Sequence, residues 1–176
     1  MRSSAQWAPA GLAAGFTLVE LMVTVAVVGI LATVAVPSMV GFVNTSRLAG
    51  ASEELTASLQ LAKSEAVRRN RAVTVCGGQA GSDNCTGGTA WTQVIVRHDA
   101  GTGADPAVIR RFEFAGGVDV TSSAAEIVFR PSGTVRAEET LTACMPTSNP
   151  ALNARVVTLM VGGGVATAKQ NGGGAC

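Results

Sequence analysis

The sequence predicts an α+β protein in which one long N-terminal helix, half membrane-spanning and half amphipathic, packs on a β-rich antiparallel globular domain. Three observations predict it: an apolar run from Phe16 to about Val43, a stripe of apolar residues with helical spacing after it, and short strand-like segments separated by turn residues in the remaining chain. Hydrophobic residues make up 47% of the 176 residues and charged residues only 14%. Because the apolar excess is concentrated in the first run, the remainder has the composition of one ordinary domain.

The apolar run carries a single charge, Glu20. A helix that rises 1.5 Å per residue needs about 20 apolar residues to cross a bilayer, so residues 16–43 are long enough. The basic residue of the leader, Arg2, favours a cytoplasmic N-terminus and an exported C-terminal domain. A secretory signal peptide has a shorter apolar region, and a plain anchor leaves Glu20 unexplained, since a carboxylate inside a membrane helix costs about 2.5–3.5 kcal/mol.

A second helical half is predicted over residues 44–71, ending near Asn70. Its apolar positions recur at intervals of three and four residues: Leu48, Ala51, Leu55, Leu59, Ala62 and Ala66. Glu65 and Arg69 have the spacing of an ion pair on the opposite face. Between the two halves, Pro37 removes a backbone hydrogen bond, and we expect a kink there.

Residues 72–176 read as short antiparallel strands punctuated by Gly, Ser, Asn and Asp clusters. The expected strands are Ala72–Cys76, Thr89–Arg97, Ala107–Phe114, Glu126–Arg130, Thr134–Arg136, Leu141–Met145, Ala154–Val161 and Val165–Lys169. Four cysteines lie in this part, which is typical of an exported domain with two disulfides. Four cysteines allow three connectivities; we favour Cys76–Cys85 as a local loop and Cys144–Cys176 as a clasp on the C-terminus. Their spacing differs from the close pairs of structural zinc sites.

The segment Gly15-Phe16-Thr17-Leu18-Val19-Glu20 resembles the class III signal of type IV pilins and type II secretion pseudopilins. The resemblance implies that residues 1–15 are a leader, removed after Gly15 by a prepilin peptidase, and that the new N-terminal residue, Phe16, is methylated. Glu20 then occupies the acidic fifth position of the mature chain, and Pro37 the position of the helix-kinking proline. It also implies a partner for Glu20, namely the Phe16 amine of a neighbouring subunit, which would fix the register between subunits.

Two further stretches, Leu59–Cys76 and Ile127–Arg136, resemble the GspH/FimT group, which contains minor pilins of type IV pili and the minor pseudopilin of type II secretion. The resemblance covers nearly the whole mature chain and implies the type IV pilin fold. It implies a subunit that primes or caps a pilus or pseudopilus, with other pilins, minor pilins or pseudopilins and an inner-membrane assembly platform as partners. The expected location is the bacterial inner membrane, with the domain (residues 72–176) in the periplasm, and later the filament.

The alternative function is DNA binding for natural transformation, which some members of the group perform through a basic motif near the C-terminus. The corresponding stretch here, Gly163–Lys169, retains only Lys169. The other candidate contacts are Arg68, Arg69 and Arg71, which also suit a solvated helix end. Phosphate binding depends on clustered Lys and Arg, and the net charge of the chain is only +1, so we do not expect nucleic acid as a partner.

Catalysis, a metal and a cofactor are not expected. The one histidine, His98, stands in a Gly- and Asp-rich stretch without a nucleophile–base motif. Asp99 and Asp105 do not have the spacing of a calcium loop, and the run Gly162–Gly164 lacks the spacing of a phosphate-binding loop.

Overall fold

The computed structural model describes residues 15–98 and 107–176, without the side chains of Val34 and Pro37. It forms two compact units, Met1–Ser38 and Met39–Cys176, and helix α1 (Leu18–Arg69) contributes to both. Most of the expected leader and the stretch with Asp99 and Asp105 lie outside the described residues. The kink expected at Pro37 falls on a side chain outside the description and stays a prediction.

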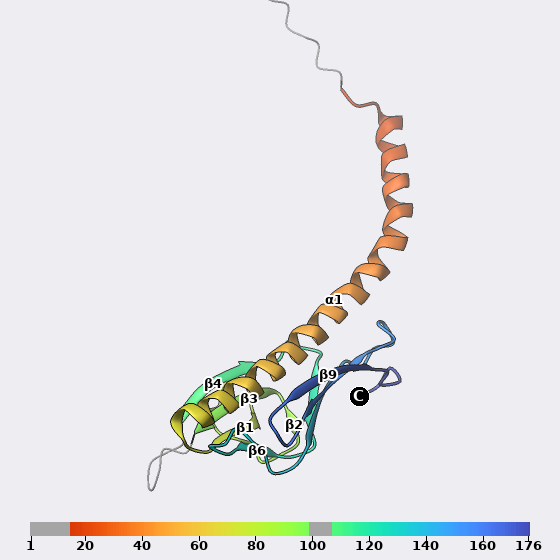
Figure 1. Cartoon of the computed structure of the whole chain (residues 1–176). Helices are drawn as coiled ribbons and strands as arrows, with labels where there is room; N and C mark the ends of the chain where they lie inside the picture. The colour runs from red at the N-terminus through yellow and green to blue at the C-terminus, as the bar shows by residue number, and fades with distance from the viewer. Residues whose placement is uncertain (1–14, 99–106) are drawn as a thin grey trace, which may run out of the picture. The chain divides into compact units, whose positions relative to one another are not determined.

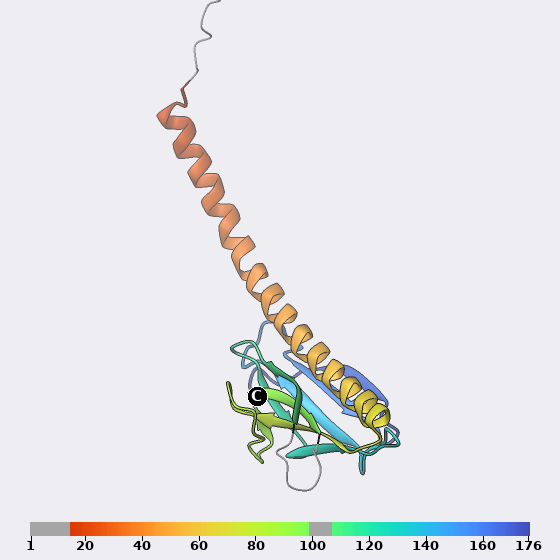
Figure 2. The same ribbon diagram turned by 90° about the vertical axis from the view of Figure 1, so that its left-hand side faces the viewer.

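In the second unit, the part of α1 after Met39 packs its apolar stripe into the domain core, as the spacing predicts (Figures 1 and 2). The six stripe residues from Leu48 to Ala66 are all at most 5% exposed. The helix ends where Asn70 adopts a positive φ of 49°. The amide of Arg71 donates to the carbonyl of Ala66, and that of Asn70 to Val67, which is a Schellman cap.

The first sheet has four antiparallel strands in the order β4-β3-β1-β6. Their bounds are Val73–Gly78 (β1), Gln93–His98 (β3), Ala107–Glu113 (β4) and Glu126–Phe129 (β6). The central strand β1 is buried along its whole length, because one face packs into the core with α1 and the loop after it is tied to the other face by the Cys76–Cys85 disulfide. Within that loop, Asp83 forms an ion pair with Arg111 of β4.

The second sheet has five antiparallel strands in the order β2-β5-β7-β8-β9. Their bounds are Ala90–Trp91 (β2), Asp119–Ser122 (β5), Glu139–Cys144 (β7), Ala154–Leu159 (β8) and Val165–Gln170 (β9). One face, with Val120, Leu141 and Val157, joins the core beneath α1, and the other face is open. The Cys144–Cys176 disulfide joins the end of β7 to residue 176, so both favoured pairings are present.

Three strand predictions were wrong. The single strand expected over residues 89–97 is divided at Thr92, where the chain leaves the second sheet and enters the first; the hydroxyl of Thr92 donates to the carbonyl of Gly78 over 2.7 Å. Strand β5 was missed because its four residues, Asp-Val-Thr-Ser, lie between Gly116-Gly117 and Ser123. Residues 134–136 form no strand, because the amide of Arg130 bonds to Thr134 across a tight turn and Val135 makes a single backbone bond, to Val161.

Candidate functional site

The N-terminal apolar segment, residues 16–43, is here called the stem. Its helix begins at Leu18, and Thr17 caps it: the Thr17 hydroxyl accepts the amide of Glu20 over 3.2 Å. Thr17 and Glu20 thus have the spacing of a capping box, of which the bond to the Thr17 hydroxyl is formed. Sequence reasoning missed the role of Thr17, although the Thr-x-x-Glu spacing is a recognisable signature of a helix start. Glu20 lies in the first turn, where the helix dipole favours a negative charge.

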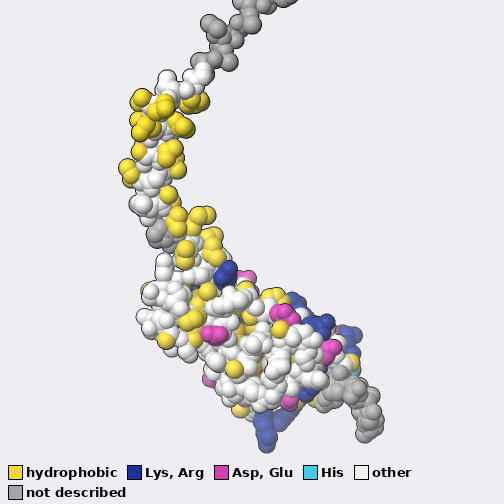
Figure 3. All heavy atoms as spheres, turned by 180° about the vertical axis from the view of Figure 1, so that it is seen from behind, with side chains coloured by type: hydrophobic (Ala, Val, Ile, Leu, Met, Phe, Trp, Pro, Cys, Tyr) yellow, Lys and Arg dark blue, Asp and Glu magenta, His cyan; other side chains and the backbone are white. Residues whose placement is uncertain are grey.

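The stem exposes nearly every large apolar side chain that the structure describes in it. Phe16 is 81% exposed, and the exposed residues continue to Val43 (Figure 3). Among the described residues, no single helix is long and apolar enough to cross a bilayer. Two parts of α1, Leu18–Thr33 and Ser38–Arg69, together have the length and composition that a membrane span needs. An apolar surface of this extent requires lipid or other protein to cover it.

Glu20 has no cationic partner within 4.0 Å among the residues that the structure describes. It is also the one charged residue between Phe16 and Val43. A cation that neutralises Glu20 is therefore not found among the described residues of the same molecule.

The arginines at the C-terminal end of α1 are already engaged. Glu65 accepts hydrogen bonds from Arg68 over 2.6 Å and from Arg69 over 2.5 Å, so the expected i,i+4 pair forms and a second arginine joins it. The Arg68 and then the Arg69 bonds lower the pKa of the Glu65 carboxyl from its ordinary value of 4.5 to about 2. Glu65 in turn raises the pKa of Arg68.

The four candidate DNA contacts do not come together. Lys169 lies on β9 beside a cleft that Glu53 also lines. Glu53 precedes Arg68 by about four turns, roughly 22 Å along the helix at 1.5 Å per residue. Arg68 and Arg69 are turned to Glu65, and Arg71 is exposed just beyond the helix. The described geometry therefore contains no continuous basic surface formed by these four residues.

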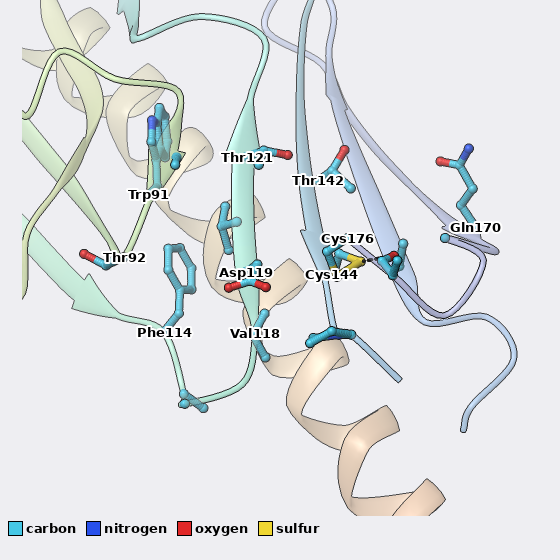
Figure 4. Close-up of a pocket in the computed structure, with 18 of the residues that line it drawn as sticks. Trp91, Thr92, Phe114, Val118, Asp119, Thr121, Thr142, Cys144, Gln170 and Cys176 are labelled. Atoms are coloured by element: carbon cyan, nitrogen blue, oxygen red, sulfur yellow. Dashed lines mark hydrogen bonds between the residues drawn. A yellow bond between two sulfur atoms is a disulfide. The ribbon is translucent and has the colours of Figure 1, made fainter. Parts of the chain in front are cut away.

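A groove of about 790 Å³ opens on the outer face of the second sheet (Figure 4). Figure 4 shows Trp91 and Phe114 on one side, Asp119 near the middle and the Cys144–Cys176 disulfide on the other side. Asp119 is the one ionisable residue among those that line it. A lone carboxylate without a histidine, lysine or second acid nearby does not form an acid–base pair.

No group of three or more potential metal ligands occurs among the described residues. His98 is the last residue of β3 and has an interaction partner. Asp99 and Asp105 lie outside the description, so the structure does not bear on a site that would include them.

Two models of known families match the sequence. One, described as Type II transport protein GspH, matches residues 51–163. The other, the prokaryotic N-terminal methylation motif, matches residues 12–36 and so includes Gly15, Phe16 and Glu20. Comparison with curated proteins gives no significant match.

The fold resembles solved structures of two bacterial proteins. The type IV minor pilin FimU of Pseudomonas aeruginosa strain PAO1 is 23% identical, with a TM-score of 0.55 over 72% of this chain and 92% of FimU. The minor pseudopilin EpsH from the Type 2 Secretion System of Vibrio cholerae is 12% identical, with a TM-score of 0.53 over 70% of this chain and 97% of EpsH. At these identities the likeness shows a shared fold.

Proposed function

Because the chain belongs to the GspH family of type IV pilin-like proteins, we propose that it is a minor pilin or pseudopilin that primes or caps a type IV pilus or a type II secretion pseudopilus. Its task is structural: the stem joins the helical core of the filament, and the domain presents a surface to neighbouring subunits. Solved structures that share its fold include those of a minor pilin and a minor pseudopilin, which supports this assignment.

The observation that carries the proposal is the exposed stem with one acid in its first turn. The apolar side chains from Phe16 to Val43 have no place in the core of the domain. They suit lipid before assembly and other stems afterwards. The acid suits neither environment alone, so it needs a specific partner.

That partner, in this proposal, is the amine that a prepilin peptidase exposes on Phe16 when it cuts after Gly15. Methylation leaves this nitrogen cationic. Glu20 of one subunit faces the Phe16 amine of its neighbour, and opposite charges attract far more strongly in an apolar bundle than in water. An unpaired Glu20 is costly there, so the pair fixes the axial register between subunits.

Before assembly, the mature chain is held in the inner membrane by its stem, with the disulfide-bonded domain in the periplasm. The oxidising periplasm suits the two disulfides. An inner-membrane assembly platform then transfers the stem from lipid into the growing filament.

The first prediction concerns the N-terminus and Glu20. Intact-mass measurement of the native protein should give a chain that begins at Phe16 and carries one methyl group. Glu20→Ala and Glu20→Gln should leave the membrane pool intact, since they remove a costly charge from the stem, but should lower the filament fraction by about tenfold or more. The exposed Glu138→Gln is the matched control. A native chain that begins elsewhere, or normal incorporation of both Glu20 variants, contradicts the proposal.

A further inference from the structure

A cleft of about 510 Å³ lies between α1 and the edge strand β9, which run side by side in both ribbon views (Figures 1 and 2). Helix residues from Thr45 to Gln60 form one wall, and β8 and β9 form the other. The cleft begins two residues after the stem ends at Val43. A neighbouring subunit that packs along the end of the stem therefore lies beside its mouth.

The floor of this cleft holds Arg155 of β8, which is only 5% exposed. Its Nη1 donates to the carbonyls of Leu152 and Ala154, each over 2.9 Å, which fixes the guanidinium in place. No described carboxylate lies within 4.0 Å of it. Its Nε and Nη2 have no hydrogen bond to a described residue, and Arg155 lines the cleft.

The residue directly opposite Arg155 in the β8–β9 pair is a second cation, Lys169. Both line the cleft. Like charges at directly opposed positions of an antiparallel pair are destabilising, and a buried cation normally has an anionic partner. Glu53, at the exposed rim, is the one acid among the lining residues and pairs with neither cation. The site therefore has an excess of positive charge that an anion would neutralise.

We propose that this cleft binds the carboxylate of an acidic side chain from a neighbouring subunit of the same filament, with Arg155 as its principal ligand and Lys169 as its second. This inference rests on the proposed function. Because Nη1 is engaged, Nε and Nη2 of Arg155 are the two nitrogens that match the two oxygens of a carboxylate.

The number and placement of the cations favour a single carboxylate over the phosphates of nucleic acid. The hydroxyls of Thr45, Ser52 and Thr56 donate to helix carbonyls over 2.8–2.9 Å, so they add no donor for an anion and leave Arg155 and Lys169 as its charged ligands. A polyanion would also meet Glu53 at the rim. Two cations in a cleft of this size suit one small anion, whereas binding along a phosphate backbone needs a row of basic residues.

The test follows incorporation of full-length variants into filaments in cells, as the ratio of the filament fraction to the membrane pool. Arg155→Met removes the charge, Lys169→Met removes the second cation, and Ala57→Trp blocks the cleft without changing any charge. We expect Arg155→Met and Ala57→Trp to lower this ratio by on the order of tenfold, and Lys169→Met by about twofold, the effects expected of a buried and an exposed charged bond. The exposed Arg136→Met should have no effect.

A second measurement tests anion binding to the cleft in the absence of a filament. In detergent micelles, sodium acetate should raise the Tm of the wild-type chain by about 1–2 °C relative to sodium chloride at equal ionic strength. Arg155→Met and Ala57→Trp should abolish this difference. If the wild type fails to enter filaments, the proposed function fails, and the acetate measurement still decides the site.

Equal responses to acetate and chloride, or normal incorporation of Ala57→Trp, would overturn the inference. So would salt-sensitive binding of a short DNA duplex that is lost in Arg155→Met and Ala57→Trp, since the anion would then be a phosphate. Arg155→Met also removes the bonds to Leu152 and Ala154, and this loss by itself lowers stability. Ala57→Trp lies on the exposed face of the helix and keeps those bonds, so it separates the loss of stability from the loss of the ligand.

Discussion

Gly77 is the position in β1 where the indole of Trp91 lies directly against the backbone. A Cβ built there would overlap the indole ring, and Trp91 is 2% exposed, so the ring has little room to retreat. Its Nε1 is also held by the carbonyl of Gly88 over 3.1 Å. The absence of a side chain at Gly77 is therefore a packing requirement that composition alone does not reveal.

Gly77→Ala should accordingly lower the free energy of unfolding by about 1–3 kcal/mol, the usual cost of overpacking a core. Gly50→Ala is the matched control, because a Cβ there meets nothing within 4 Å and lies on a helix. That change should be neutral or stabilising by up to about 1 kcal/mol. Chemical unfolding of the full chain in micelles measures both, and equal stability of the two variants would contradict the packing argument.

The Glu65 carboxyl makes part of the stability depend on pH. Its pKa is about 2 in the fold, below its ordinary value of 4.5, so its contribution is fully present above pH 4.5 and is lost as the pH falls towards 2. The difference in stability between the wild type and Glu65→Gln should therefore be constant above about pH 5, shrink as the pH falls, and be lost as the pH passes below about 2. Acid unfolding at low and high salt measures it; added salt should shrink the difference, because Arg68 is exposed. A difference that is as large at pH 2 as at pH 5 would assign Glu65 another role.

The turn between β8 and β9 is fastened to α1 by one side chain. The ammonium of Lys63 donates to the carbonyls of Gly162 and Gly163 over 3.2 and 3.1 Å. Gly163 has a φ of 72° and packs against the carbonyl of Gly133 in the neighbouring turn. Helix and hairpin thus meet through polar contacts at this end of the domain.

Lys63→Met keeps the aliphatic part of this side chain and removes the two bonds. We expect the Gly163 amide, which donates to Met160 over 2.8 Å, to exchange with deuterium about fivefold faster, the effect of losing about 1 kcal/mol. The exposed Arg71→Met should leave that rate unchanged. Unaltered exchange at Gly163 in the Lys63 variant would show that the hairpin holds its place without the helix.

At the level of elements, the sequence predicts the helix well, but it does not predict every strand. The spacing from Leu48 to Ala66 predicts both the helix and its buried face, because the period of a helix repeats many times over that length. Strand β5 spans only four residues among turn formers, and too few periods exist there to detect. The division at Thr92 depends on which sheet pairs with each flanking residue, and pairing is a property of the assembled domain.

Across the whole molecule, the stem could be inferred locally, since length, apolarity and one acid are written in consecutive residues; cleavage after Gly15 stays a prediction. The sequence favours one set of disulfide partners without singling it out, because three connectivities satisfy the count. The cleft of Arg155 and Lys169 could not be foreseen. It exists because β8 and β9 pair in a register that sets these two residues opposite each other beneath α1, and they are separated by a whole hairpin in the chain.

The passage of the chain from one sheet to the other at Thr92 has a mechanical consequence. A single residue separates Trp91, in one sheet, from Gln93, in the other, so the backbone has no slack between them. A load that arrives along α1 acts on a core that both sheets share. Neither sheet can separate from the other without breaking backbone hydrogen bonds between its own strands. A subunit under tension should therefore unfold as one unit, and its two sheets should not separate first.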